Sequence, residues 1–430
     1  MKRAVAGARR LVGEVRVPGE LEPAAEALLL AALATGPSRV EYAPPAVAPA
    51  VVALRALGLE VQHEGLTAAV TGKGARGLQQ PEAPLDLSTL GDAALLAVAA
   101  LAAQPFTSQL RLGADGGQVS ALAAGLAAMG AVVADEGDGL WRVEGSDELS
   151  GADHAAADLG AGVKLALLLA GVLASGQTTV REPVGSRDRV DLRLKARGVR
   201  VAGTRQGEPI QRVMTVAGEQ ELKPGDVEID GDLELAMPAV VGAVTLRGSE
   251  VTVRRVSVRP ETRTFVDVLR QVNAQVELVE VDGGTDLVAR FGRPKSTRVA
   301  EGRAARLLRH VPLLAVLATQ AEGEFIIRDI EGLRQGAAGH DYDYVAHLVG
   351  LLRAVEAKVG EYPEGIVIDG GQPLKGAEID SRGDAAVIQA FAVAGLLGVG
   401  EMVIDGAEGV DEVFPGFFEM LEGIRKEKRR

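Results

Sequence analysis

The 430-residue chain contains no cysteine, and only 3% of its residues are aromatic. The absence of cysteine excludes disulfides, zinc–thiolate centres and a thiol nucleophile. Hydrophobic residues nevertheless make up 47% of the sequence, so the core must be built mainly from Ala, Val and Leu. A chain of this length is expected to form two or three domains and to bury a large core.

The sequence also lacks an excess of basic residues and a long apolar run. Its formal net charge of -13 argues against nucleic acid or an anionic membrane as a partner, because phosphate contact needs a basic surface. The uncharged apolar runs at 93–103 and 165–174 have the length of core helices and are too short for membrane spans. Residues 1–10 lack the continuous apolar stretch of a signal peptide. We therefore expect a cytoplasmic protein.

A repeated unit organises the chain. In each copy, a short strand-like run ends at a glycine, and an Ala/Leu/Val-rich helix follows. The six glycines are separated by 69 to 81 residues and are Gly19, Gly91, Gly160, Gly231, Gly302 and Gly383. The helices predicted after them are 24–34, 92–103, 163–174, 233–244, 306–319 and 385–397. Such a period is a stronger fold signal than any single helix or strand.

The first five units continue into a second amphipathic run and a closing strand. These runs are 51–61, 119–133, 190–201, 265–279 and 345–359. The polar stretch 217–226 contains Pro224-Gly225 and follows the third unit. We therefore predict an α/β protein of two domains with three strand–helix units each. The predicted domains are residues 18–226, and residues 1–17 together with 227–430.

Four of the predicted helices have an acidic residue directly after the repeated glycine, namely Glu20, Asp92, Asp232 and Asp384. Acidic residues at these positions cap helix N-termini. Alternatively, the helix N-termini could point into a shared cleft and attract anions. Capping is favoured, because an acidic side chain competes with an anionic ligand for the same N–H groups.

Several segments are similar to those of the enolpyruvyl transferases. They are Gly-Glu-Val-Arg-Val-Pro-Gly at 13–19, Leu-Ala-Leu-Leu-Leu-Ala-Gly at 165–171, Ser186-Arg187-Asp188, residues 374–384, and Phe-Pro-Gly-Phe-Phe-Glu at 414–419. On these motifs the chain resembles the 5-enolpyruvylshikimate-3-phosphate (EPSP) synthase family. The sister enzyme that acts on UDP-N-acetylglucosamine commonly uses a cysteine, which this chain lacks.

The resemblance implies a fold and an activity. The family folds as two domains of three units each, an inside-out α/β barrel, which close over shikimate-3-phosphate and phosphoenolpyruvate. It implies no cofactor and a monomer. Both substrates are anionic, so their binding needs several Lys and Arg side chains. Addition of the substrate hydroxyl to the enol carbon needs a proton donor and a base.

In the first half of the chain, most of the family's ligand-binding positions are substituted. The Lys and Arg of the first helix correspond to Leu21 and Glu26. The Arg of the second unit corresponds to Val98, and a further Arg corresponds to Gly117. The Ser-Ser-Gln triplet corresponds to Gly-Ala-Gly at 160–162. Only the Ser-Arg-Asp segment remains.

The second half departs in the same way. The catalytic Asp of the family corresponds to Arg309, and the acid that follows it corresponds to His310. After an apparent insertion at 335–339, the family's Lys, Glu and Arg correspond to His340, Asp341 and Tyr344. The Gly-Asp of the last unit is kept as Gly383-Asp384, but the following His-Arg is Ala385-Ala386, and the late Lys is Glu412.

Two functional hypotheses follow. In the first, the chain is an EPSP synthase homologue that no longer catalyses and serves as a binding or regulatory protein for small anionic metabolites. In the second, it is an active carboxyvinyltransferase with a rebuilt site. The candidate catalytic residues are Asp341 and Arg309, and the candidate substrate-binding residues are Ser186, Arg187, Asp384 and His340.

The run 340–344 and His347 contain residue types that bind metals, but a polar loop that enters a helix explains them equally well. We therefore predict no metal and no cofactor.

Overall fold

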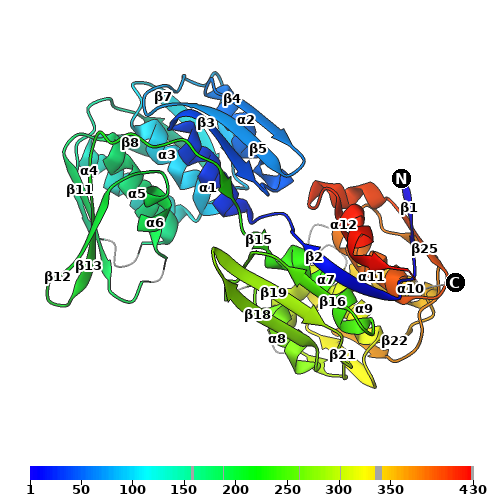
Figure 1. The fold of residues 1–430 in the computed structure, drawn as a ribbon. Helices are drawn as coiled ribbons and strands as arrows, with labels where there is room; N and C mark the ends of the chain where they lie inside the picture. Colours follow the sequence, from blue (N-terminus) through cyan, green and yellow to red (C-terminus); the bar gives the residue numbers. More distant parts are fainter. Residues whose placement is uncertain (156–158, 187, 261, 301, 335–340, 428–430) are drawn as a thin grey trace. The chain divides into compact units, whose positions relative to one another are not determined.

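The computed structural model describes residues 1–155, 159–186, 188–260, 262–300, 302–334 and 341–427. The chain forms two compact units (Figure 1). Unit 1 contains Met1–Gly19 and Asp230–Arg430, and unit 2 contains Glu20–Ile229. Within the described ranges, no helix is both long and apolar enough to cross a bilayer.

Unit 2 contains three four-stranded sheets with the same topology. In each sheet the first two strands are parallel and the other neighbours are antiparallel. In spatial order, the first sheet is β14 (Val227–Glu228), β3 (Thr35–Glu41), β5 (Thr67–Lys73) and β4 (Glu60–Glu64). The second is β6 (Leu85–Leu87), β7 (Thr107–Leu112), β9 (Leu140–Glu144) and β8 (Val132–Gly137). The third is β10 (Asp153–Ala155), β11 (Gln177–Pro183), β13 (Gln211–Ala217) and β12 (Val201–Gln206).

Three apolar helices form the centre of unit 2. They are α1 (Leu21–Ala32), α3 (Ala94–Ala102) and α5 (Ala161–Leu173), and α3 packs against both of the others. All residues of α3 are buried, because a helix that is apolar on every side must be surrounded by protein. The second helix of each repeat has an exposed face; these helices are α2 (Ala48–Ala56), α4 (Gly116–Met129) and α6 (Val190–Lys195).

Unit 1 repeats this plan. One sheet has the order β18 (Gln275–Val281), β19 (Gly284–Arg290), β16 (Glu250–Val253), β2 (Arg10–Val15) and β26 (Arg425–Lys426). A second has the order β20 (Arg298–Val299), β21 (Glu324–Arg328), β23 (Gly365–Asp369) and β22 (Lys358–Tyr362). A third has the order β1 (Lys2–Ala6), β25 (Glu401–Asp405) and β24 (Glu378–Asp380), and β15 (Gly231–Asp232) pairs with β17 (Val256–Ser257).

The central helices of unit 1 are α7 (Leu233–Thr245), α9 (Val311–Thr319) and α11 (Ala385–Leu397), which pack against one another. The other α-helices among its described residues are α8 (Thr264–Gln271), α10 (Tyr344–Ala354) and α12 (Phe417–Ile424). The N-terminal segment belongs to this unit because β1 pairs antiparallel with β25 and β2 pairs parallel with β16. The predicted two-domain α/β fold is thus confirmed.

Two boundaries differ from those expected from the sequence. Residue 226 was placed at the domain boundary, but β14 pairs with β3 of unit 2, and that unit continues to Ile229. The helix predicted at 306–319 is divided into the 3₁₀ segment η3 (Ala304–His310) and α9. Pro312 explains the division, because its fixed φ and missing N–H suit the first turn of an α-helix and not its interior.

A second set of repeated glycines, which the sequence analysis missed, holds the sheets against the central helices. Gly72, Gly145 and Gly218 are 73 residues apart. A Cβ atom on Gly145 would lie 2.2 Å from the carbonyl oxygen of Gln104 and 2.5 Å from that of Leu101. Gly72, Gly218 and Gly370 face equivalent carbonyl oxygens at 1.9 to 2.3 Å. Only glycine permits this approach of a strand to the end of a helix.

We predict that Gly145→Ala destabilises unit 2 by about 1–3 kcal/mol or more, because the added methyl group would displace backbone and not a flexible side chain. Gly203→Ala is the control, since Gly203 lies within β12 and a Cβ there meets nothing within 4 Å. Urea unfolding of both variants measures the difference. Equal stability of the two variants would contradict the close-packing role of Gly145.

Candidate functional site

The N-terminal ends of α1, α3 and α5 converge within unit 2. A Cβ atom on Gly91 would lie 2.5 Å from Oε1 of Glu22, and one on Gly162 would lie 2.7 Å from Cβ of Asp92. Gly91 and Asp92 belong to the 3₁₀ segment η2 (Gly91–Ala93) that leads into α3. The three helix ends therefore form one surface, and acidic side chains lie on it where the resemblance implies anion-binding groups.

Glu26 is the most perturbed carboxyl group on this surface. Its side chain is almost fully buried, and Oε1 lies 2.5 Å from Nη1 of Arg193. Burial raises the pKa of Glu26 to about 7; the neighbouring carboxylates of Glu22 and Asp92 add to this rise and Arg193 opposes it. Arg193 therefore already has a carboxylate partner within unit 2. Val98, at a family Arg position, is fully buried in the apolar core.

Protonation of Glu26 links the stability of unit 2 to pH. The ordinary pKa of a Glu is 4.5 and the native value is about 7. Between these pH values the native state therefore holds a proton that the unfolded state has lost. The free energy of unfolding falls as the pH rises through this range, by up to roughly 3 kcal/mol.

We predict that Glu26→Gln raises the free energy of unfolding by about 1–3 kcal/mol at pH 8 and changes it little at pH 5, because glutamine cannot become charged. Urea unfolding at both pH values measures this. Glu60→Gln, which replaces an exposed carboxylate of β4, is the control and should show no such pH dependence. The same effect of Glu26→Gln at both pH values would contradict the assignment.

A buried ionic cluster lies beside this surface in unit 2. The Lys164 network consists of four cations, three carboxylates and one hydroxyl, contributed by Lys164, Glu182, Ser186, Asp188, Arg189, Asp191, Lys195 and Arg212. Lys164 Nζ donates to Glu182 Oε2 at 2.7 Å and to Ser186 Oγ at 3.2 Å, and it also pairs with Asp188. Ser186 Oγ donates to Asp188 Oδ1 at 3.1 Å.

Arg212 and Lys195 complete the network. Arg212 donates to Glu182 Oε1 at 3.0 Å and to Asp191 Oδ1 at 2.5 Å, and Lys195 donates to Asp191 Oδ2 at 2.8 Å. The side chains of Lys164 and Glu182 are 5% and 0% exposed. The cations of the network are therefore paired with carboxylates of the same unit. A lone Lys inside the apolar run that begins at Val163 is the local signal of this network in the sequence.

We predict that Glu182→Gln destabilises unit 2 by about 3–5 kcal/mol, since it leaves the buried Lys164 and the largely buried Arg212 without their shared carboxylate. Asp153→Asn is the control, because it removes the exposed ion pair with Arg181 at 2.6 Å and should have a far smaller effect. Chemical unfolding measures both. If both variants lose the same stability, the network does not have this role.

The candidate residues of unit 1 lie in different environments. Arg309 is exposed at the end of η3, whereas the next residue, His310, is buried. The ring of His310 stacks on Phe265 with centroids 5.3 Å apart. Burial lowers the pKa of His310 to about 4, so the imidazole is neutral at pH 7. Burial also raises the pKa of Asp232, whose carboxylate caps α7 at the Glu234 N–H.

Asp384 and Tyr344 form a second group in unit 1. Asp384 Oδ1 accepts hydrogen bonds from Val387 N at 2.8 Å and from Tyr344 Oη at 3.2 Å. The carboxylate thus caps α11 and binds the tyrosine that stands at a family Arg position. Burial raises the pKa of Tyr344, so its hydroxyl remains neutral.

The remaining predicted residues are not gathered with this group. Asp341 is exposed, and Arg187 and His340 lie outside the described residues. His347 Nε2 lies 3.0 Å from the carbonyl oxygen of Asp380. In the part of the chain that the structure describes, no group of three or more His, Cys, Asp and Glu could hold a metal ion.

Comparison with known proteins identifies the family. The profile of the family described as EPSP synthase (3-phosphoshikimate 1-carboxyvinyltransferase) matches residues 5–421. The chain belongs to the EPSP synthase family. The match covers both units, so the resemblance noted in the sequence is confirmed.

Relatives and solved structures agree with this assignment. The chain is 32% identical over 433 residues to the 3-phosphoshikimate 1-carboxyvinyltransferase of Brevibacillus brevis, covering 97% of this chain and 98% of the relative. It is 34% identical to that of Synechococcus sp. (strain WH7803), with 96% of each covered. An EPSP synthase structure from Acinetobacter baumannii superposes with a TM-score of 0.70 at 23% identity, over 99% of both chains. The enolpyruvyl transferase NikO from Streptomyces tendae superposes with a TM-score of 0.60 at 18% sequence identity, over 98% of this chain and 96% of NikO.

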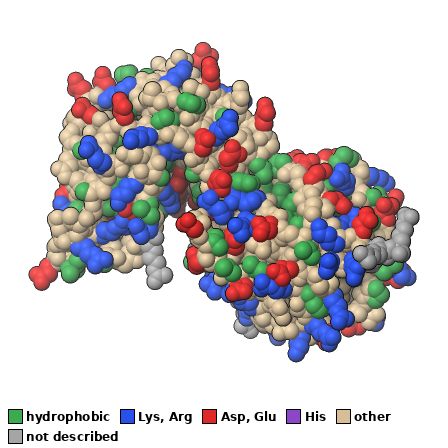
Figure 2. Space-filling view, in the orientation of Figure 1, with side chains coloured by type: hydrophobic (Ala, Val, Ile, Leu, Met, Phe, Trp, Pro, Cys, Tyr) green, Lys and Arg blue, Asp and Glu red, His purple; other side chains and the backbone are tan. Residues whose placement is uncertain are grey.

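This member of the EPSP synthase family carries charges of both signs on its surface. On the face shown in Figure 2, basic and acidic side chains are interspersed over each unit and no large area is uniformly basic. Acidic Glu22 and Glu26 lie on α1 in unit 2. The cations that remain nearby are paired with carboxylates.

Proposed function

We propose that this EPSP synthase family member does not transfer the enolpyruvyl group at an ordinary enzymatic rate and acts as a cytoplasmic, monomeric binding or regulatory protein for a small anionic metabolite. The observation that carries the proposal is the charge balance of unit 2. Each cation of its Lys164 network is paired with at least one carboxylate of the same unit. Arg193 is paired with Glu26 in the same unit.

Cations that are already paired offer little to offset the desolvation of the family's anionic substrates. Phosphate and carboxylate groups lose water when a site closes over them, and only fixed cations offset that loss. A hydrogen bond to a charged group contributes about 1.5–3 kcal/mol, and each 1.4 kcal/mol corresponds to about a tenfold change in affinity. Losing several such contacts, with acidic Glu22 and Glu26 on the same surface, removes the basis for tight binding of both substrates.

The residues of unit 1 support the same proposal. Arg309 stands where the family has its catalytic acid, and a guanidinium cannot accept a proton near neutral pH. His310 is neutral, but its ring is buried against Phe265. Asp384 is engaged as a helix cap and by Tyr344. These contacts leave Asp341 as the remaining predicted acid among the described candidates.

The second candidate function is carboxyvinyl transfer at a rebuilt site. Relatives named 3-phosphoshikimate 1-carboxyvinyltransferase that are 29–34% identical over 96–99% of this chain favour it. In that case the residues that bind shikimate-3-phosphate would be Ser186, Arg187, Asp384 and His340. Asp341 and Arg309 would act near the reacting hydroxyl.

We predict no detectable formation of enolpyruvylshikimate phosphate or inorganic phosphate when the purified protein is incubated with phosphoenolpyruvate and shikimate-3-phosphate. Phosphorus NMR follows both products, and the Brevibacillus brevis relative is the positive control. Val98→Arg alone should not restore activity, because the other cations remain absent. Turnover on the order of 1 per second or faster would overturn the proposal and favour the rebuilt site.

A binding measurement separates the two parts of the proposal. Calorimetric titration should show weak or no binding of phosphoenolpyruvate, because Lys164, Arg193 and Arg212 of unit 2 are already paired with carboxylates. Binding of shikimate-3-phosphate without turnover would support a ligand-binding role. Tight binding of both substrates would show that the lost cations are replaced elsewhere.

A further inference from the structure

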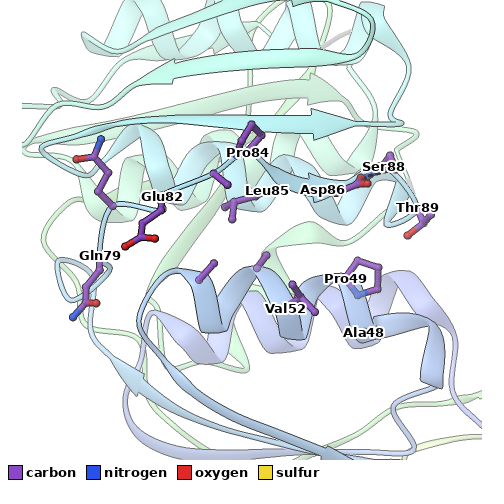
Figure 3. Close-up of a pocket in the computed structure, with 14 residues that line it drawn as sticks. Ala48, Pro49, Val52, Gln79, Glu82, Pro84, Leu85, Asp86, Ser88 and Thr89 are labelled. Carbon is purple, nitrogen blue, oxygen red and sulfur yellow. Dashed lines mark hydrogen bonds between the residues drawn. The ribbon is translucent and has the colours of Figure 1, made fainter.

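A long groove lies within unit 2, outside the segments that resemble the family's ligand-binding motifs. Helix α2 forms one wall, and the extended segment 79–89, which includes β6, forms the other (Figure 3). The groove has a volume of about 730 Å³. Cavities of roughly 300–1,000 Å³ hold small organic ligands in proteins. Its size therefore suits a small molecule.

The wall formed by α2 is apolar although it faces solvent. Ala48, Val52 and Ala56 are exposed and follow one another at four-residue intervals, so they share one face of the helix. Val52 is 63% exposed. Ala83 and Pro84, on the opposite wall, are also exposed. Apolar side chains on both walls of a concave surface favour the burial of an apolar ligand body.

The charged side chains that line the groove among its described residues are all carboxylates, and its other polar side chains are neutral. Glu82 and Asp86 contribute carboxylates, and none of the described residues that line the groove is Lys, Arg or His. In Figure 3 the carboxylate of Glu82 points toward α2, and Asp86 lies farther along the same segment, next to Ser88. Glu82 and Asp86 are four residues apart, so their Cα atoms lie at most about 14 Å from each other.

The carboxylate of Asp86 is held in place. Its Oδ1 accepts hydrogen bonds from Ser88 Oγ at 2.7 Å and from Ser88 N at 3.1 Å. The Ser88 hydroxyl, followed by its backbone N–H and then by Arg111 on the neighbouring strand β7, lowers the pKa of Asp86. The group is therefore an anion at neutral pH, with a fixed position in the groove.

We propose that this groove binds an organic cation of the aliphatic diamine class, with its apolar chain along α2 and its two ammonium groups near Glu82 and Asp86. The spacing of the two carboxylates, the apolar walls of the groove and the absence of cations among its described lining residues together define this ligand. The proposal concerns a site separate from that of the proposed function, and it holds whether or not the protein transfers enolpyruvyl groups.

Three probes of equal chain length test the charge requirement. They are diaminooctane, octanediol and octanedioate, titrated into the full-length protein by calorimetry and by saturation-transfer NMR. Diaminooctane should bind at least tenfold more tightly than octanediol, and octanedioate should not bind. Binding of diaminooctane should weaken as salt is added, because exposed charges are screened. Equal binding of the diamine and the diol, or no binding of the diamine, overturns the proposal.

Variants locate the binding in the groove. Glu82→Gln should weaken diaminooctane binding at least threefold, and Val52→Lys should abolish it by placing a cation on the apolar wall. Both replaced side chains are exposed, so we expect both variants to fold as the unmodified protein does. Glu60→Gln, in β4 outside the groove, is the matched control and should bind as the unmodified protein does. Unchanged binding in both groove variants would overturn the assignment.

A peptide is the competing occupant. An extended peptide with two lysines separated by three aliphatic residues presents the same charges on a backbone that can also form hydrogen bonds. If this peptide binds the groove while diaminooctane does not, the site belongs to a protein partner, and the small-molecule proposal is wrong. If diaminooctane binds and the peptide does not displace it, the proposal stands.

Discussion

The packing of three apolar helices at the centre of each unit is the constraint on which the rest of the structure depends. Helices such as α3, whose residues are all buried, cannot lie on a surface, so the sheets and the second helices must surround them. Aromatic residues are scarce, and the small Ala, Val and Leu side chains let the helices approach closely. The close contacts at Gly72, Gly145 and Gly218 follow from this packing, because they bring a strand of each sheet onto the end of a central helix.

The same packing determines which side chains meet at the helix N-termini. In unit 2 it brings together the ends of α1, α3 and α5. On an EPSP synthase scaffold this surface would need cations to bind anionic substrates. Here Glu26 is buried beside Arg193, and the neighbouring cations belong to the Lys164 network. The apolar helices and the glycines specify this fold without the charged residues on that surface.

The Lys164 network shows why a buried charge cannot be interpreted from its residue type alone. A lysine in the family's third helix segment could serve a ligand, but Lys164 is almost fully buried and contacts Glu182, Ser186 and Asp188. Its cost of burial is offset only by those partners. The groove beside α2 presents the opposite case, in which carboxylates lie at an exposed apolar surface with no Lys or Arg among the described lining residues.

The sequence by itself determined the repeated α/β plan, the two-domain α/β fold and the family, because apolar periodicity and turn glycines are local signals that recur along the chain. Through the resemblance it also predicted that several family cations are replaced, as at Leu21 and Val98. Only the tertiary structure decided which of the remaining charges are already paired. Lys164 and Arg212 are 48 residues apart, yet both contact Glu182, and no local pattern encodes such a contact. The division of the fifth helix at Pro312 and the groove between α2 and β6 likewise depend on how separate segments pack, which is a property of the whole unit.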